Sequence, residues 1–139
     1  MVSTNGSGTR QPRARKGASQ RYVIEAAPDV RIYHPADSAI SYDMKLWGEL
    51  YRPTVGLMVV AVPEDSIPHM ECYRSGEMTV HEALLASQWL GLDHIVASHY
   101  VTPENPSVVD FARLAKVAAE TTGLSPRVTI PRAGEIIDL

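Results

Sequence analysis

The feature that most constrains the fold is an almost uninterrupted apolar segment at residues 55–62, where only Gly56 separates valine, leucine, methionine and alanine residues. A strand with one solvated face alternates apolar and polar residues, and this segment does not alternate. We therefore expect a strand buried on both faces, as in parallel sheets that helices cover. The segment is far shorter than the roughly 20 apolar residues of a membrane-spanning helix, and no such run occurs elsewhere in the sequence.

The residues before this strand predict a hairpin and a helix. Two β-rich runs, Arg21–Glu25 and Val30–His34, flank a Pro-Asp turn and are expected to pair. A helix is expected over about 41–52, with Ser41 as its N-cap and a proline directly after it. Its apolar positions recur at helical spacing and are Met44, Trp47, Leu50 and Tyr51.

The residues after the strand alternate between helix and strand. Thr79 and Glu82 have the spacing of a capping box, which marks the start of a helix. The expected order is a loop at 63–78, a helix from Thr79 to Gly91, a strand at His94–Ser98, a helix from Ser107 to Gly123, and closing strands at 127–130 and 135–139. A hairpin followed by alternating helices and strands is typical of an α/β layer rather than a bundle or a sandwich.

Composition limits the class of protein and its compartment. The length of 139 residues and the hydrophobic content of 45% suit one domain with a substantial core. The single cysteine, Cys72, cannot form an internal disulfide, and the polar N-terminus lacks the apolar stretch of a secretory signal. We therefore expect a cytoplasmic protein without a membrane segment.

Residues 1–19 are expected to form a flexible basic arm ahead of a domain at residues 20–139. The arm is rich in serine, threonine, glycine and arginine, and it contains no acidic residue. A basic arm can contact phosphate groups, so nucleic-acid binding is one hypothesis for it. The whole chain nevertheless carries a net charge of −3, and the arm has no aromatic residues for base stacking. Nucleic acid is therefore not the expected partner.

Two polar residues follow predicted strands directly. Asp37 comes after the second strand of the hairpin, and His99 comes after the strand at His94–Ser98. Ligands of open α/β sheets bind beyond the carboxyl ends of the strands, so the two side chains can share one edge of the sheet. Taken alone, an aspartate or a histidine at a strand end is more often a turn residue than a metal ligand.

Several segments resemble the metal-dependent hydrolases of the metallo-β-lactamase superfamily, in particular the branch related to ascorbate-phosphate lactonase. Ile32–Ser38 is similar to the family's strand ending in His-Ala-Gly-Asp-Thr, and Asp43–Pro53 to its helix with Asp-Met-Lys-Leu-Ile-Gly-Glu. Met78–Ala83 is similar to a Met-Gly-Pro-Glu-Glu-Ala helix start, and Ile95–Thr102 to a strand ending in Met-His-Tyr-Gly-Thr. Gly134–Leu139 resembles the family's last strand.

This resemblance implies the C-terminal half of an αββα sandwich, with a mixed sheet and helices on one face. It assigns Asp37 and His99 as catalytic metal ligands, with Asp37 bridging two ions and His99 completing the shell of one. The expected cofactor is zinc or another divalent metal, which lowers the pKa of a bound water so that hydroxide forms near neutral pH. The expected reaction is hydrolysis of a small-molecule lactone, ester or phosphodiester.

The resemblance also predicts that this chain needs a partner. The superfamily's His-x-His-x-Asp-His block is not present, and Ala36 and Val101 replace two of the family's glycines. A catalytic zinc typically has three protein ligands, which Asp37 and His99 do not supply by themselves. We therefore expect a complementary N-terminal-half chain that restores a hydrolase. The alternative is a non-catalytic remnant that self-associates as a homo-oligomer and serves as a binding or scaffold protein.

The remaining candidate residues favour structural roles. Among the other histidines, His34 is expected at a strand end, His81 in the first turn of a helix, and His94 at a strand start. The segment His69–Cys72 holds three possible metal ligands, but its spacing matches no standard zinc motif, so a surface loop is expected. The tryptophans, Trp47 and Trp89, lie on apolar helical faces and are expected in the core.

Overall fold

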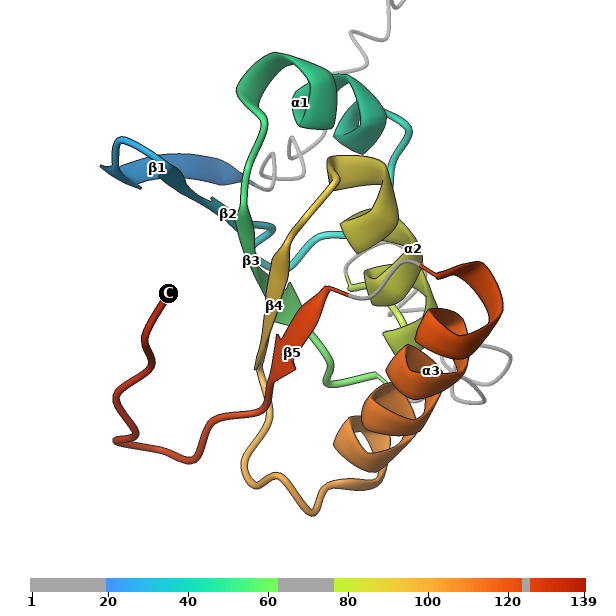
Figure 1. The fold of residues 1–139 in the computed structure, drawn as a ribbon. Coiled ribbons are helices and arrows are strands. Elements are labelled where there is room, and N and C mark those ends of the chain that lie inside the picture. Colours follow the sequence, from blue (N-terminus) through green and yellow to red (C-terminus); the bar gives the residue numbers. More distant parts are fainter. Residues whose placement is uncertain (1–19, 63–76, 124–125) are drawn as a thin grey trace, which may run out of the picture.

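The computed structural model describes residues 20–62, 77–123 and 126–139. The expected basic arm at residues 1–19 and the predicted surface loop at His69–Cys72 lie outside these ranges. The elements are β1 (Tyr22–Ala27), β2 (Val30–His34), α1 (Asp43–Tyr51), β3 (Val55–Val59), α2 (Val80–Leu90), β4 (His94–Ser98), α3 (Pro106–Thr122) and β5 (Arg127–Thr129), shown in Figure 1.

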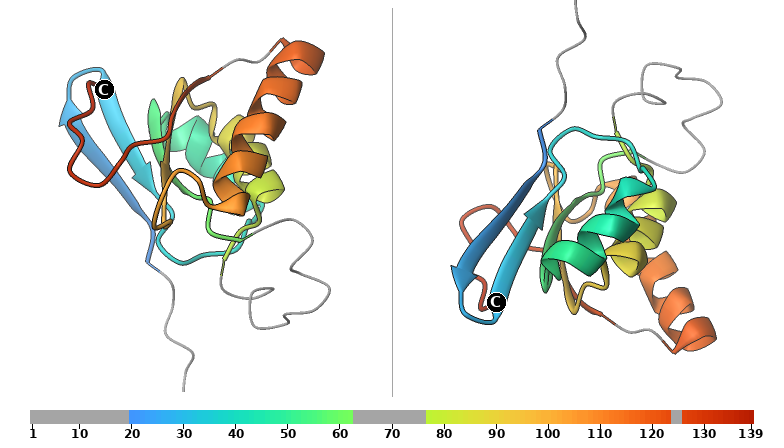
Figure 2. Two further views of the ribbon diagram at one scale, coloured as in Figure 1. Left: turned by 90° about the horizontal axis from the view of Figure 1, so that it is seen from below. Right: turned by 90° about the horizontal axis from the view of Figure 1, so that it is seen from above.

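The strands of the described residues form one mixed sheet in the order β1-β2-β3-β4-β5. The hairpin strands β1 and β2 pair antiparallel, and the other neighbouring pairs are parallel. All three helices lie on one side of the sheet, as two further views show (Figure 2). The predicted α/β fold, with a mixed sheet and helices on one face, is confirmed.

The apolar segment forms the middle strand of the sheet. Met58 belongs to the core cluster that includes Phe111 of α3 and Leu90 of α2, so it points toward the helices. Val59, the next residue, points to the opposite face and is also buried. Strand β3 ends at Val59, earlier than predicted, because its partner β4 ends opposite at Ser98. Burial on both faces explains why the segment does not alternate.

The helix ends agree only partly with the sequence signals. The capping box of α2 is confirmed: the Thr79 hydroxyl accepts from the Glu82 N–H, and the Glu82 carboxylate accepts from the Thr79 N–H. The predicted N-cap at Ser41 is wrong, because Tyr42 occupies that position without a side-chain hydrogen bond. Helix α1 ends at Tyr51, and its C-cap, Arg52, adopts a left-handed conformation before the proline.

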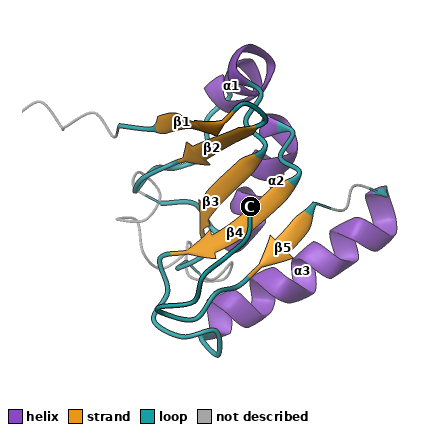
Figure 3. Cartoon of the chain, turned by 60° about the vertical axis from the view of Figure 1, so that its left-hand side comes forward, coloured by secondary structure: helices purple, strands orange, loops and turns teal. Residues whose placement is uncertain are grey.

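The predicted last strand, at residues 135–139, is wrong. Among the described residues, β1 and β5 are the edge strands of the sheet, and residues 135–139 pair with neither of them. The C-terminal segment instead crosses the side of the sheet opposite the helices, as Figures 2 and 3 show. Arg127 holds it there by donating a hydrogen bond to the Asp138 carbonyl. Within residues 20–62, 77–123 and 126–139, no helix combines the length and apolar character needed to cross a membrane.

Candidate metal centre

The loop after β2 fixes the backbone on both sides of Asp37. The Ala36 N–H donates to His34 Nδ1 at 2.9 Å, and the Ser38 N–H donates to the Ala36 carbonyl at 3.0 Å. The Ser38 side chain is buried and donates to the Pro35 carbonyl at 2.7 Å. Asp37 therefore projects from an anchored turn, with 68% of its side chain exposed. His34 is a structural residue, as predicted.

Two residues at this site have left-handed backbone conformations. Ala36 has a φ of 51° and His99 a φ of 63°. Residues with a Cβ rarely adopt such angles, and glycine adopts them without steric cost. The left-handed backbone at Ala36 is therefore a conformation that suits the glycine of the family's His-Ala-Gly-Asp-Thr pattern. Val101, at the other substituted glycine, is exposed and is not among the residues with positive φ.

Asp37 and His99 meet beyond the carboxyl ends of β2 and β4. His99 Nδ1 lies 3.3 Å from Asp37 Oδ1, and 41% of the His99 side chain is exposed. Strand β3 lies between the two strands in the sheet, so the side chains meet across its carboxyl end. The expectation that they share one edge of the sheet is confirmed, while their role as metal ligands stays a prediction.

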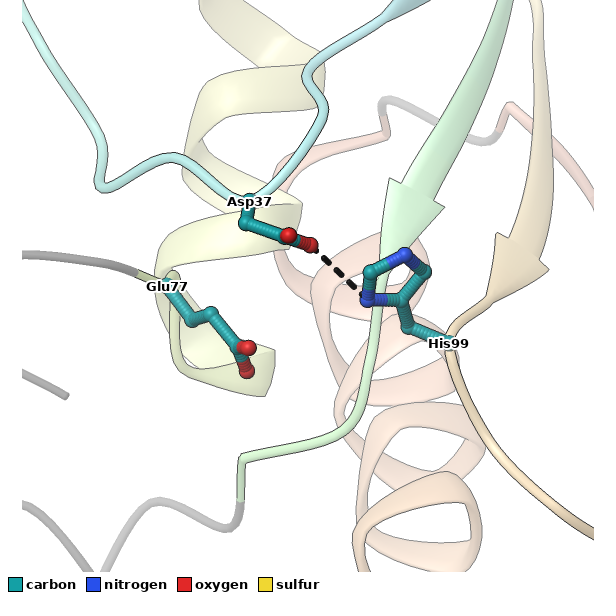
Figure 4. A group of neighbouring side chains, drawn as sticks. All are labelled: Asp37, Glu77 and His99. Atoms are coloured by element: carbon teal, nitrogen blue, oxygen red, sulfur yellow. Dashed lines mark ion pairs between the residues drawn. The ribbon is translucent and has the colours of Figure 1, made fainter. Parts of the chain in front are cut away.

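A third side chain joins them that the sequence did not identify. Glu77 offers a carboxylate oxygen, and one donor atom from each of Asp37, Glu77 and His99 lies within 4.8 Å of the others. Figure 4 shows the three side chains coming from separate segments into the same space. The position of Glu77 is fixed by its neighbours, because Met78 is fully buried and Thr79 forms a β-bridge with Val62.

The sequence held one signal for Glu77. The apolar segment ends at Val62, and the capping box begins at Thr79. A chain that leaves the carboxyl end of a strand and enters the next helix brings the start of that helix back to the same edge of the sheet. An acidic residue two positions before the N-cap is therefore a candidate for that edge. The sequence alone, however, does not reveal the bridge between Val62 and Thr79, so it does not distinguish Glu77 from the other residues of the predicted loop.

The three donors fit a divalent cation by their chemistry. One imidazole nitrogen and two carboxylate oxygens are ligands that zinc and similar ions accept, and three protein ligands leave a fourth position for water. Among the described residues, no arginine or lysine forms an ion pair with Asp37 or Glu77. A bound cation would therefore provide the charge that offsets the two carboxylates.

The other predicted residues lie outside this group. His81 is exposed on α2. His94 is buried, and its Nδ1 accepts a hydrogen bond from Arg127, which leaves Nε2–H to donate to the Thr129 hydroxyl. Burial, followed by the nearby Arg127 cation, lowers the pKa of His94. The tryptophans, Trp47 and Trp89, pack against the core as expected.

Known proteins similar to this chain are metal-dependent hydrolases by name. No protein-family model matches the chain. A UPF0173 metal-dependent hydrolase from Rubrobacter xylanophilus is 30% identical over an alignment of 123 positions that covers 86% of this chain and 43% of that protein. Another, from Methanocaldococcus jannaschii, is 27% identical over an alignment of 140 positions that covers 100% of this chain and 55% of that protein. The chain thus spans about half the length of these relatives.

Two solved structures match this chain in fold. The metallo hydrolase Igni18 from Ignicoccus hospitalis matches with a TM-score of 0.53 and 27% identity, covering 77% of this chain and 40% of that chain. The metallo-beta-lactamase fold protein YhfI from Bacillus subtilis also matches with a TM-score of 0.53, at 16% identity, covering 79% of this chain and 40% of that chain. The predicted metallo-β-lactamase fold is confirmed. More particularly, this chain is homologous to part of the UPF0173 metal-dependent hydrolases.

Proposed function

We propose that this chain is the C-terminal half of a metal-dependent hydrolase, and that a complementary half supplies the remaining metal ligands. The observation that carries the proposal is the 3.3 Å approach of Asp37 to His99 at the carboxyl edge of the sheet. The names of the relatives support metal dependence, and their length, about twice that of this chain, supports a second half. Zinc or another divalent cation is the proposed cofactor.

The chemistry assigned to each residue follows from its donor atom. The cation supplies a charge that lowers the pKa of a water molecule at the site and makes a nucleophile available near neutral pH. His99 offers a neutral nitrogen donor, and the Asp37 carboxylate has two oxygens with which it can face two cations. Both side chains are exposed enough for a substrate to approach. The proposed substrates are small-molecule lactones, esters or phosphodiesters, each of which has an electrophilic centre that water attacks.

The side of the sheet opposite the helices supports a partner half. The chain leaves apolar side chains exposed on β1, where Tyr22 is 49% and Ile24 is 51% exposed. Ile24 pairs with Ile32, which pairs with Val55, so these side chains share the face without helices. Exposed apolar surface of this kind marks an association site. In an αββα sandwich, a second sheet covers this face.

Reconstitution tests the proposal. The chain would be co-expressed with the half of the Rubrobacter xylanophilus relative that completes the fold, and the complex assayed on a nitrophenyl ester, an aromatic lactone and a nitrophenyl phosphodiester. We expect chelator-sensitive hydrolysis of at least one substrate, reduced at least a hundredfold by Asp37→Ala or His99→Ala. His81→Ala, an exposed histidine on α2, is the matched control. A stable complex that is inactive on the whole panel, or active regardless of Asp37 and His99, would refute the proposal.

The same exposed surface favours a second candidate. Two copies of the chain can cover each other's β1 surface and form a non-catalytic homo-oligomer with a binding or scaffold role. Sedimentation of the chain with and without the complementary half separates the two candidates. A homodimer that the half does not dissociate, together with no hydrolysis, supports the scaffold. A one-to-one complex with the half supports the hydrolase.

A further inference from the structure

We infer that Glu77 is a third protein ligand, and that this chain therefore binds one divalent cation without ligands from another half. The inference rests on the metal dependence proposed above but goes beyond it, since Asp37 and His99 alone do not make a site of three ligands.

The distances within the group match ligands of a common ion. Two donor atoms bound to zinc at about 2.0–2.1 Å with tetrahedral angles lie about 3.4 Å apart. Asp37 Oδ1 and His99 Nδ1 are 3.3 Å apart, which is longer than a typical hydrogen bond and close to that ligand spacing. Glu77 offers a carboxylate oxygen within 4.8 Å of one donor atom on each of these two side chains. The remaining gap of at most about 1.4 Å is within reach of a glutamate side chain with rotatable torsions.

Each of the three ligands projects from an anchored backbone. Buried Ser38 holds the turn at Asp37, and strand β4 leads directly into His99. The Val80 N–H donates to the Val62 carbonyl at 3.2 Å, which ties the segment carrying Glu77 to the chain just after β3. Ligands held in place before the metal arrives lose little entropy on binding. The three segments thus form a site without a contribution from another chain.

The donor set selects the kind of ion. One nitrogen and two oxygens with no thiolate suit zinc, cobalt, manganese or ferrous iron. Cobalt is a useful probe for this set, because its visible absorption reports the number and type of donors, whereas zinc binding is followed by the heat it releases. Neither readout depends on hydrolysis.

The test compares metal binding by matched glutamate variants. The full chain, without an affinity tag and freed of metal with a chelator, would be titrated with zinc chloride by calorimetry and with cobalt chloride by visible absorption. We expect one ion per chain, an affinity at least tenfold weaker in Glu77→Gln, and a changed cobalt spectrum in that variant. Glu49→Gln, on the exposed side of α1, should bind both ions as the wild type does. Equal unfolding midpoints in chelator show that the variants are folded.

Two results would overturn the inference. One is a Glu77→Gln variant with the zinc affinity and the cobalt spectrum of the wild type. The other is binding that survives in Glu77→Gln but is lost in Cys72→Ser, which would assign the ion to the His69–Cys72 segment. Failure here is separate from failure of the proposed function: a reconstituted hydrolase indifferent to Glu77→Gln refutes only this inference, and a chain that binds zinc through Glu77 but yields no active complex refutes only the hydrolase.

Discussion

At the scale of single residues, the candidate centre is built on two unfavourable backbone conformations. Ala36 immediately precedes Asp37, and His99 is itself in the group, and both have positive φ. A left-handed conformation costs a residue with a Cβ about 1–2 kcal/mol. Histidine is among the residues found there more often, and alanine is not. Glycine at position 36 would therefore avoid this free-energy cost.

Replacing Ala36 with glycine should stabilise the chain. Relief of the left-handed strain outweighs the extra entropy of glycine in the unfolded chain, so we expect a gain of about 0.5–1 kcal/mol in the free energy of unfolding. Urea denaturation measures it. Ala39→Gly, in the same loop but without a positive φ, is the control and should lower stability by a similar amount. A loss of stability in Ala36→Gly would show that the turn at Asp37 differs from the one described.

The second residue-scale prediction concerns pH. Because burial and Arg127 lower the pKa of His94 from 6.5, the folded chain keeps this histidine neutral where the unfolded chain protonates it. Its contribution to stability is complete above about pH 6.5 and is lost as the pH falls toward the lowered pKa of the folded state. Urea midpoints at pH 7.5 and 5.5 should therefore differ more in the wild type than in His94→Gln. Equal pH dependence in the two proteins would contradict the prediction.

The sequence revealed part of the centre for a physical reason. Asp37 lies three residues after β2 and His99 directly follows β4, and the carboxyl ends of these parallel strands lie at one edge of the sheet, so their meeting could be predicted. Glu77 does not directly follow a described strand, and the bridge between Val62 and Thr79 places its segment at that edge. A contact between residues far apart in the chain depends on the path of the loop between them, which no local pattern records.

At the scale of elements, the contact between α1 and α2 is unusually close. A Cβ built on Gly48 would lie 2.6 Å from the Trp89 carbonyl oxygen and 3.0 Å from the Leu90 Cα. Both are backbone atoms, which cannot turn aside as a flexible side chain can. The close packing of α1 on α2 thus explains the glycine at position 48.

Gly48→Ala should destabilise the chain although alanine favours helices. The helical preference of alanine over glycine is worth about 1 kcal/mol, and overpacking typically costs about 1–3 kcal/mol. We expect a net loss of about 1 kcal/mol in the free energy of unfolding, measured by urea denaturation. Glu49→Ala, at an exposed position of the same helix, should change it by less than about 0.5 kcal/mol. A more stable Gly48→Ala would show that α1 does not pack this closely.

Elements were predictable where their signals are local. The capping box of α2 lies within four consecutive residues, and the structure has both of its hydrogen bonds. The expected strand at 135–139 has strand-forming residues, but this segment crosses the face of the sheet and does not run beside an edge strand, so it pairs with neither β1 nor β5. Ser41 is not the N-cap because α1 begins at Asp43, which makes Tyr42 the capping position. In both cases, the path of the chain in the folded protein overrides the local preference of the sequence.

At the scale of the whole molecule, helices cover one side of the sheet. The C-terminal segment covers only part of the other side (Figure 3). Buried Val59 and exposed Ile24 show how unevenly that side is covered. Asp37 and His99 lie next to the carboxyl ends of β2 and β4 in this sheet. The surface proposed for the complementary half therefore adjoins the proposed metal ligands, and one association event would both cover apolar side chains and complete the centre.

The most direct measurement of the central claim is anomalous diffraction at the zinc edge from crystals of this chain exposed to zinc chloride. We expect a single strong peak about 2 Å from the Asp37 carboxylate, the His99 ring and the Glu77 carboxylate. Diffraction above and below the edge distinguishes zinc from other ions. Crystals in which these three side chains are ordered, yet no peak lies between them, would contradict the metal centre described above.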